Sequence, residues 1–287
     1  MEFMSFLENM DKNRLQKVLL VVISALLLAA LVCLVVIIIS SLGPTTPVTQ
    51  GFDVVDLTLK DKDVSTGTLV LADKTHLYDE NNALDLVECQ TYRDEQMVLD
   101  GITDKPYLPY KGMKLTKEAM KAAHNMLSDA KKNIGSAAIT IDAAFGRIAY
   151  GGDDAEGYKT GLLMFLSDNT SDSGAYVKLA NEYSHWLKTN AAKYGFINAF
   201  DDAYRYVGIV HATYMSEEEL SLADYIEYLK KNTDSSKALT VKVGDTTYSV
   251  YYAKGGEGET VKVPAKGEYT ISGTNEGGVI ITLKNAK

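Results

Sequence analysis

The stretch WLKTNAAKYGFI, residues 186–197, carries the strongest structural signal in this chain of 287 residues. Large apolar side chains in and just before it recur at helical spacing and share one side of a predicted helix over about 180–194: Tyr183, Trp186, Leu187 and Tyr194. Gly195 follows the last of them, and glycine is the residue that most often ends a helix in the left-handed conformation. A second block, YRYVG at 204–208, follows closely.

Two further helices are predicted on either side of this stretch. Residues 117–132 have apolar side chains on one face, and the Thr116 hydroxyl is placed to cap the first turn. A helix that begins near Ser221 has an apolar stripe, and Ser221 and Asp224 are spaced to cap it. Short apolar runs predict strands at 67–74 and 137–141.

The apolar pattern changes after residue 236. Alternate positions become apolar, as in Tyr248, Val250 and Tyr252, and glycines separate the runs. Alternation of period two is typical of half-buried strands. We therefore expect a small all-β appendage over 237–287 and an α+β fold for the chain.

The N-terminal region predicts a membrane anchor. Residues 18–42 form an apolar run without a charged residue, and about 20 such residues can cross a bilayer as a helix. Basic residues precede the run, which predicts a cytoplasmic N-terminus over 1–17 and a domain outside the cell membrane. A linker is expected at 43–66. A cleaved signal peptide is the alternative, although its apolar core is usually shorter.

Charge and cysteine content narrow the function classes. A formal net charge of -9 argues against nucleic acid as a partner, because nucleic-acid binding needs a basic surface. The chain has two cysteines, and Cys33 lies within the predicted span. Cys89 therefore has no partner for a disulfide in the exported part, whose stability must come from its core.

Four blocks in the expected order resemble the VanY-like D-Ala-D-Ala carboxypeptidases, zinc enzymes that trim peptidoglycan stem peptides. The blocks are residues 186–197, 204–208, 211–212 and 220–229. The resemblance covers about 67–229. It implies a VanY-like/Hedgehog-type D,D-peptidase domain at 67–236, followed by strands similar to a tail found on some of these proteins.

The chain departs from this family at the positions that hold the metal. The family segment Ser-Glu-His-x-Thr-Gly-x-Ala-x-Asp-Leu, whose His and Asp bind zinc, corresponds to EGYKTGLLMFL at 156–166. Tyr158 stands in place of the His and Phe165 in place of the Asp. The family's Glu-Pro-Trp-His corresponds to FDDA, so Phe200 replaces the general base and Ala203 replaces the last zinc ligand.

A third family segment, the substrate-binding Ser-Gly-Tyr-Arg, aligns less clearly. It corresponds to AAFG at 143–146, which puts Gly146 in place of the Arg. A shift of one residue would bring Arg147 into register instead. Both alignments remain open on the sequence.

These exchanges have a direct chemical consequence. Catalytic zinc needs three N, S or O ligands and a water, and without zinc no hydroxide nucleophile forms near neutral pH. We therefore predict no catalytic residue, no metal site and no cofactor, although zinc is expected in the family. The exchange would also make the former cleft apolar, which predicts a binding cleft formed by Tyr158, Phe165, Phe200, Ala203 and Arg205. In the alternative, the aromatic rings fill the vacated space as core.

Three functions remain open. We favour a membrane-anchored, extracytoplasmic pseudo-peptidase that binds or scaffolds an envelope protein or a peptidoglycan peptide. The second is an active peptidoglycan D,D-carboxypeptidase with other ligands, which a zinc measurement would reveal. The third is a structural spacer that binds through its β appendage.

Overall fold

The computed structural model describes residues 52–83, 85–135, 139–147, 155–168 and 178–285. The chain divides into two units after residue 45, and every described residue belongs to the second. The predicted cytoplasmic segment 1–17 and the predicted span 18–42 lie outside the described residues. Among the residues that are described, no helix combines the length and the apolar character needed to cross a membrane.

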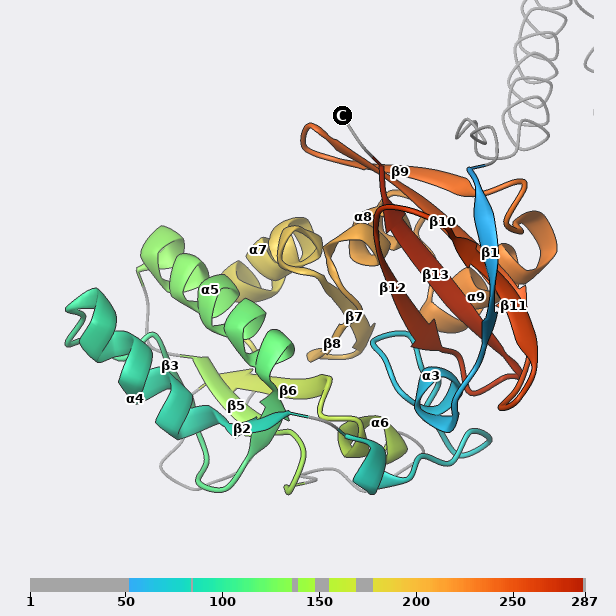
Figure 1. Ribbon diagram of the computed structural model, residues 1–287. Coiled ribbons are helices and arrows are strands. Elements are labelled where there is room, and N and C mark those ends of the chain that lie inside the picture. Colours follow the sequence, from blue (N-terminus) through green and yellow to red (C-terminus); the bar gives the residue numbers. More distant parts are fainter. Residues whose placement is uncertain (1–51, 84, 136–138, 148–154, 169–177, 286–287) are drawn as a thin grey trace, which may run out of the picture. The chain divides into compact units, whose positions relative to one another are not determined.

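Residues 67–236, which are predicted to form a peptidase-like domain, are called the peptidase-like part below. A five-stranded sheet organises this part (Figure 1). Its strand order is β3-β5-β6-β8-β7, in which β3 pairs with β5 in parallel and the other neighbours are antiparallel. The strands are β3 (Tyr107–Pro109), β5 (Ile139–Ala143), β6 (Leu163–Asp168), β7 (Phe196–Phe200) and β8 (Ala203–Tyr206). Strand β5 confirms the strand predicted at 137–141 over its described residues, 139–141.

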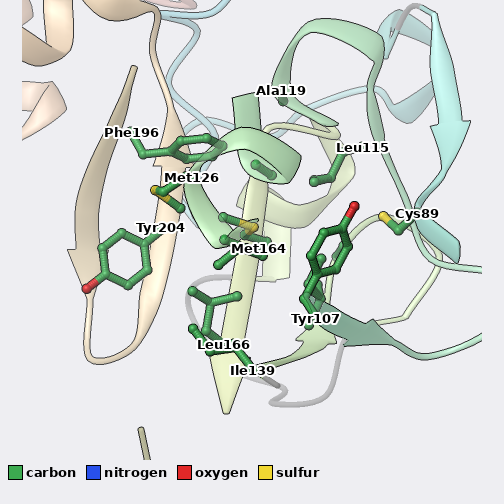
Figure 2. Packing of buried hydrophobic residues seen from close by; sticks show 14 of the residues in the cluster. Cys89, Tyr107, Leu115, Ala119, Met126, Ile139, Met164, Leu166, Phe196 and Tyr204 are labelled. Carbon is green, nitrogen blue, oxygen red and sulfur yellow. The ribbon is translucent and has the colours of Figure 1, made fainter. Parts of the chain in front are cut away.

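Two of the predicted helices cover one face of this sheet. They are α5 (Lys117–Ile134) and α7 (Asn181–Asn190), and a 3-10 turn, η2 (Ala191–Tyr194), extends α7. Figure 2 shows part of the buried core that they form with the strands, including Met126 of α5, Met164 of β6 and Phe196 of β7. The elements that complete this part are β2 (Leu86–Glu88), α4 (Cys89–Asp100), β4 (Lys114–Thr116), α6 (Ala155–Lys159) and η1 (Glu80–Asn82).

The predicted helix caps are confirmed. The Thr116 hydroxyl accepts a hydrogen bond from Ala119 N at 3.3 Å. Gly195 ends η2 with a φ of 86°, and a Cβ on it would lie 2.7 Å from the Tyr206 ring. Glycine is required at this position for two reasons, because the backbone is left-handed and the helix end meets β8 closely.

The predicted β appendage is a separate antiparallel sheet with the order β12-β13-β10-β9. Its strands are β9 (Leu239–Val243), β10 (Thr246–Lys254), β12 (Glu268–Gly273) and β13 (Gly278–Lys284). Helices α8 (Ile209–Glu217) and α9 (Leu222–Asn232) pack on one face of it, where Tyr225 and Ile226 share a buried cluster with Val250 and Ile280. The appendage therefore shares a core with the peptidase-like part.

The predicted linker at 43–66 is wrong in its second half. Strand β1 (Val54–Thr58) pairs with β11 (Thr260–Pro264), and a short helix, α3 (Asp61–Ser65), follows it. Leu59, Val261 and Tyr251 belong to a cluster on the face of the sheet opposite α8 and α9. Local sequence could not reveal β1, because its partner strand lies some 200 residues further along the chain.

The strand predicted at 67–74 is also wrong, since no strand forms there. Its backbone groups instead bond to the end of β12: Leu69 N donates to Ser272 Oγ at 2.9 Å, and Leu71 N donates to Thr274 O at 3.0 Å. Leu69 and Val70 are fully buried. The apolar run thus reflects burial without strand pairing.

Candidate functional site

The four residues aligned with the family's metal and base positions lie together in the fold. They form one apolar cluster with two further residues: Ala143, Tyr158, Leu163, Phe165, Phe200 and Ala203. We call this set the site cluster. The four aligned residues come from two stretches of sequence, 156–166 and 200–203, which the fold brings together. Their assignment to the family's metal and base positions stays a prediction.

The strand register explains how these residues meet. Phe165 of β6 lies directly opposite Ala203 of β8, and Phe200 of β7 pairs with Ala203 from the other side. A register shift in β5 places Ala143 opposite Phe165 on the remaining flank. Tyr158 enters from α6, just before β6 begins. The sequence did not indicate Leu163 as a site residue, and it indicated Ala143 only within the segment aligned with the family's substrate-binding Ser-Gly-Tyr-Arg. Leu163 and Phe165 are two residues apart on β6, so they lie on the same face of the strand.

The site cluster is filled with side chains. Tyr158 is 1% exposed and Phe165 is 4% exposed, whereas Phe200 is half-buried. The ring centroids of Phe165 and Phe200 are 6.5 Å apart. A Cβ on Gly157 would lie 2.8 Å from a methyl carbon of Leu163, which shows how tightly this region is packed. The burial favours the alternative in which the aromatic rings occupy the vacated space as core.

Arg205, the fifth residue of the predicted cleft, is not part of the site cluster. It follows Ala203 by two positions on β8, but its Nη2 donates to the Val70 carbonyl oxygen at 2.6 Å. Burial lowers the pKa of Arg205 to about 10, so the guanidinium stays charged at neutral pH. This side chain ties β8 to the irregular segment at 67–74.

A cavity of about 280 Å³ borders the site cluster at Tyr158. Phe145, Gly146, Glu80 and Lys159 also line it. Arg147, the other candidate for the family's substrate-binding Arg, stacks 3.6 Å above the ring of Tyr110 and does not line this cavity.

Zinc does not fit the residues at the site cluster. Phe165, Phe200 and Ala203 have no side-chain donor atom, and a single phenol cannot provide the three ligands that catalytic zinc requires. Within the described ranges, no group of three His, Cys, Asp or Glu residues is placed to hold a metal ion. That the chain binds no zinc stays a prediction.

The buried histidines have structural partners elsewhere. His211 lies near the start of α8, with Nδ1 3.0 Å from the Tyr225 hydroxyl and Nε2 3.1 Å from the Thr282 hydroxyl. Burial lowers the pKa of His211 to about 4, so the ring is neutral. His124 Nδ1 lies 3.1 Å from the Tyr107 hydroxyl.

Comparison with known proteins supports the fold. No protein-family model matches the chain. A D-alanyl-D-alanine carboxypeptidase of Enterococcus faecium is 33% identical over 111 residues, which are 34% of this chain and 35% of that protein. The chain thus matches about a third of the length of this curated relative.

Solved structures give the same picture. The vancomycin-resistance D,D-dipeptidase VanXYg, in complex with a D-Ala-D-Ala phosphinate analogue, superposes with a TM-score of 0.64 and 16% identity over 81% of this chain and all of that chain. The zinc-containing D,D-pentapeptidase VanY scores 0.39 at 17% identity, over 55% of this chain and 98% of that chain. On the first of these matches, the chain has the fold of the D,D-dipeptidase VanXYg.

Proposed function

We propose that this chain is a non-catalytic relative of the D-Ala-D-Ala carboxypeptidases, acting in the bacterial envelope by binding instead of hydrolysis. One observation carries the proposal. The four residues aligned with the metal ligands and general base come together in the fold, yet they form a buried apolar cluster. Without a metal ion, water in such a cluster has no group to lower its pKa.

A carboxylate returned to this environment would not restore the chemistry by itself. Ionised groups are costly to bury without a partner, and the neighbours of Phe165 in the site cluster are largely apolar. We infer that the chain has kept the D,D-peptidase fold and has lost the hydrolytic activity.

The direct test is release of D-Ala from a D-Ala-D-Ala-terminated pentapeptide by the purified full chain, with the similar Enterococcus faecium carboxypeptidase as the positive control. The proposal expects no release above the uncatalysed background, with or without added zinc. Turnover that a chelator abolishes would show that the chain has other metal ligands, and the second function would replace the first.

We also propose that residues 18–42 anchor the chain in the cell membrane with the described domain outside. The apolar run and its basic flank support this orientation. The chain is expected to stay in the membrane fraction after alkaline extraction, and a variant lacking 18–42 is expected to be released. Protease added to intact cells without an outer membrane barrier should digest the domain if it is outside.

A further inference from the structure

A groove of about 460 Å³ lies near the start of α8, between the peptidase-like part and the β12–β13 sheet. On one face of this sheet, helices α8 and α9 cover β9, β10 and β13, and they bury Val250 and Ile280 there. They leave the face of β12 open, so Glu268 and Thr270 are exposed. This volume falls within the range of small-molecule sites.

The sheet wall of the groove presents two rows of polar side chains. Thr270 of β12 lies directly opposite Thr282 of β13. In the next row, Lys284 of β13 is flanked by Glu268 and Tyr248 on its two neighbouring strands. Hydroxyl groups both donate and accept hydrogen bonds, whereas a carboxylate accepts and an ammonium donates. The wall can therefore satisfy a ligand that carries many hydroxyl groups.

The opposite wall comes from the peptidase-like part. It is lined by Tyr206 at the end of β8, by Glu118 in the first turn of α5 and by Thr68. Tyr206 and Tyr248 are half-buried, so each contributes both aromatic surface and a hydroxyl group. The groove thus combines aromatic surface with hydrogen-bonding groups on both sides.

Buried hydrogen bonds hold the groove in shape. His211 joins the sheet wall to the helices through Thr282 at 3.1 Å and Tyr225 at 3.0 Å. Ser272 of β12 accepts a hydrogen bond from Leu69 N, which fixes the segment next to Thr68. A wall that is already ordered loses less conformational entropy when a ligand binds.

We propose that this groove binds a neutral oligosaccharide. The described lining includes the carboxylates of Glu118 and Glu268 and the ammonium of Lys284, which lies 3.8 Å from Glu268. That charge balance disfavours polyanionic ligands, which need an excess of positive charge. Sugar hydroxyls match the mixed donors and acceptors, and the apolar C–H faces of sugar rings suit the two tyrosines. The proposal does not depend on whether the site cluster binds zinc.

The test is an isothermal calorimetric titration of the full chain with a chitin-type oligosaccharide of four to six N-acetylated units. The chain is kept in a detergent that has no sugar head group. Saturable binding is expected. The variants Thr270→Val and Glu268→Gln should each weaken it by roughly three- to tenfold, the effect of losing one hydrogen bond. Both positions are exposed, so neither change should alter the unfolding temperature.

Matched controls change the same chemistry outside the groove. Thr260→Val on β11 and Glu257→Gln in the turn before it are both exposed and should leave affinity unchanged. Absence of saturable oligosaccharide binding would overturn the proposal, as would equal losses in groove and control variants. Binding of a D-Ala-D-Ala pentapeptide at the groove, but not of the oligosaccharide, would also overturn it and identify a peptide site.

Discussion

The ring centroids of Phe165 and Phe200 lie 6.5 Å apart, with the ring planes inclined by 36°. The sequence resemblance predicts that these two positions correspond to a zinc-binding Asp and a general base of the VanY-like carboxypeptidases. Their carrier strands, β6 and β7, are not neighbours in the sheet. β8 lies between them, and Ala203 on β8 pairs with both residues. The small side chain of Ala203 leaves room for the two rings to meet above it.

Replacement of Phe165 by Ala should destabilise the fold by about 3–5 kcal/mol, because the ring is almost fully buried and its removal leaves a cavity. Phe200→Ala should cost clearly less, since that ring is half-buried. Denaturant unfolding of the two variants measures the difference. If both variants unfolded like the wild type, the rings would line an open cleft and the core interpretation would fail.

The variant Tyr158→His should not bind zinc, because one imidazole cannot hold the ion in a tetrahedral site. The triple variant Tyr158→His, Phe165→Asp and Ala203→His is different, because it returns all three aligned ligands. If the alignment is right, zinc should raise the unfolding temperature of the triple variant and leave each single variant unchanged. An unfolding temperature of the triple variant that ignores zinc would contradict the alignment.

Acidification should destabilise the fold because His211 is buried in its neutral form. Its pKa is about 4 in the fold and near 6.5 in the unfolded chain, so between these values the unfolded state binds a proton that the native state does not. The contribution is complete above pH 6.5 and is lost as the pH falls toward 4, on the order of 3 kcal/mol.

The pH dependence can be assigned with two variants. His211→Gln should flatten the decline between pH 6.5 and 4, whereas His185→Gln, at an exposed position on α7, should leave it intact. Unfolding free energies measured across this range decide the matter. An unchanged slope in His211→Gln would show that other groups cause the decline.

Cys89 should be unreactive in the native protein. The thiol is fully buried at the start of α4, and burial raises its pKa to about 12, so almost no thiolate is present at neutral pH. In a Cys33→Ser background, a thiol reagent should label Cys89 slowly under native conditions and rapidly in denaturant. Rapid native labelling would mean that α4 opens readily.

Deletion of the chain after Lys237 should not leave a folded remainder. Tyr225 and Ile226 of α9 share their core with Val250 and Ile280 of the β sheet, so deletion exposes the helix faces. Circular dichroism and limited proteolysis would show this loss. The spacer function is therefore better tested with surface variants of the sheet than by truncation.

Features with a local cause could be predicted from the sequence. The caps at Thr116, Gly195 and Ser221 depend on neighbouring residues, and each forms as expected. Features with a distant cause could not be predicted in this way. Strand β1 forms by pairing with β11, and the segment 67–74, of which residues 69–71 are buried, bonds to β12 without joining a sheet.

The candidate site shows the same division. Four of the six members of the site cluster could be named from the sequence through the aligned motifs, and these are four of the five residues of the predicted cleft. Arg205 is the exception, because the position of its guanidinium is set by Val70, which is 135 residues away in the sequence. Burial of the cluster depends on how α6 packs against the sheet, which the motif alone does not reveal.

The zinc content of the purified full chain tests the central claim most directly. The chain is expressed with zinc in the medium, freed of loosely bound ions by gel filtration, and measured by atomic emission together with its protein concentration. We predict no stoichiometric zinc in the wild type. One equivalent of zinc that survives gel filtration, and whose removal lowers the unfolding temperature, would contradict the account.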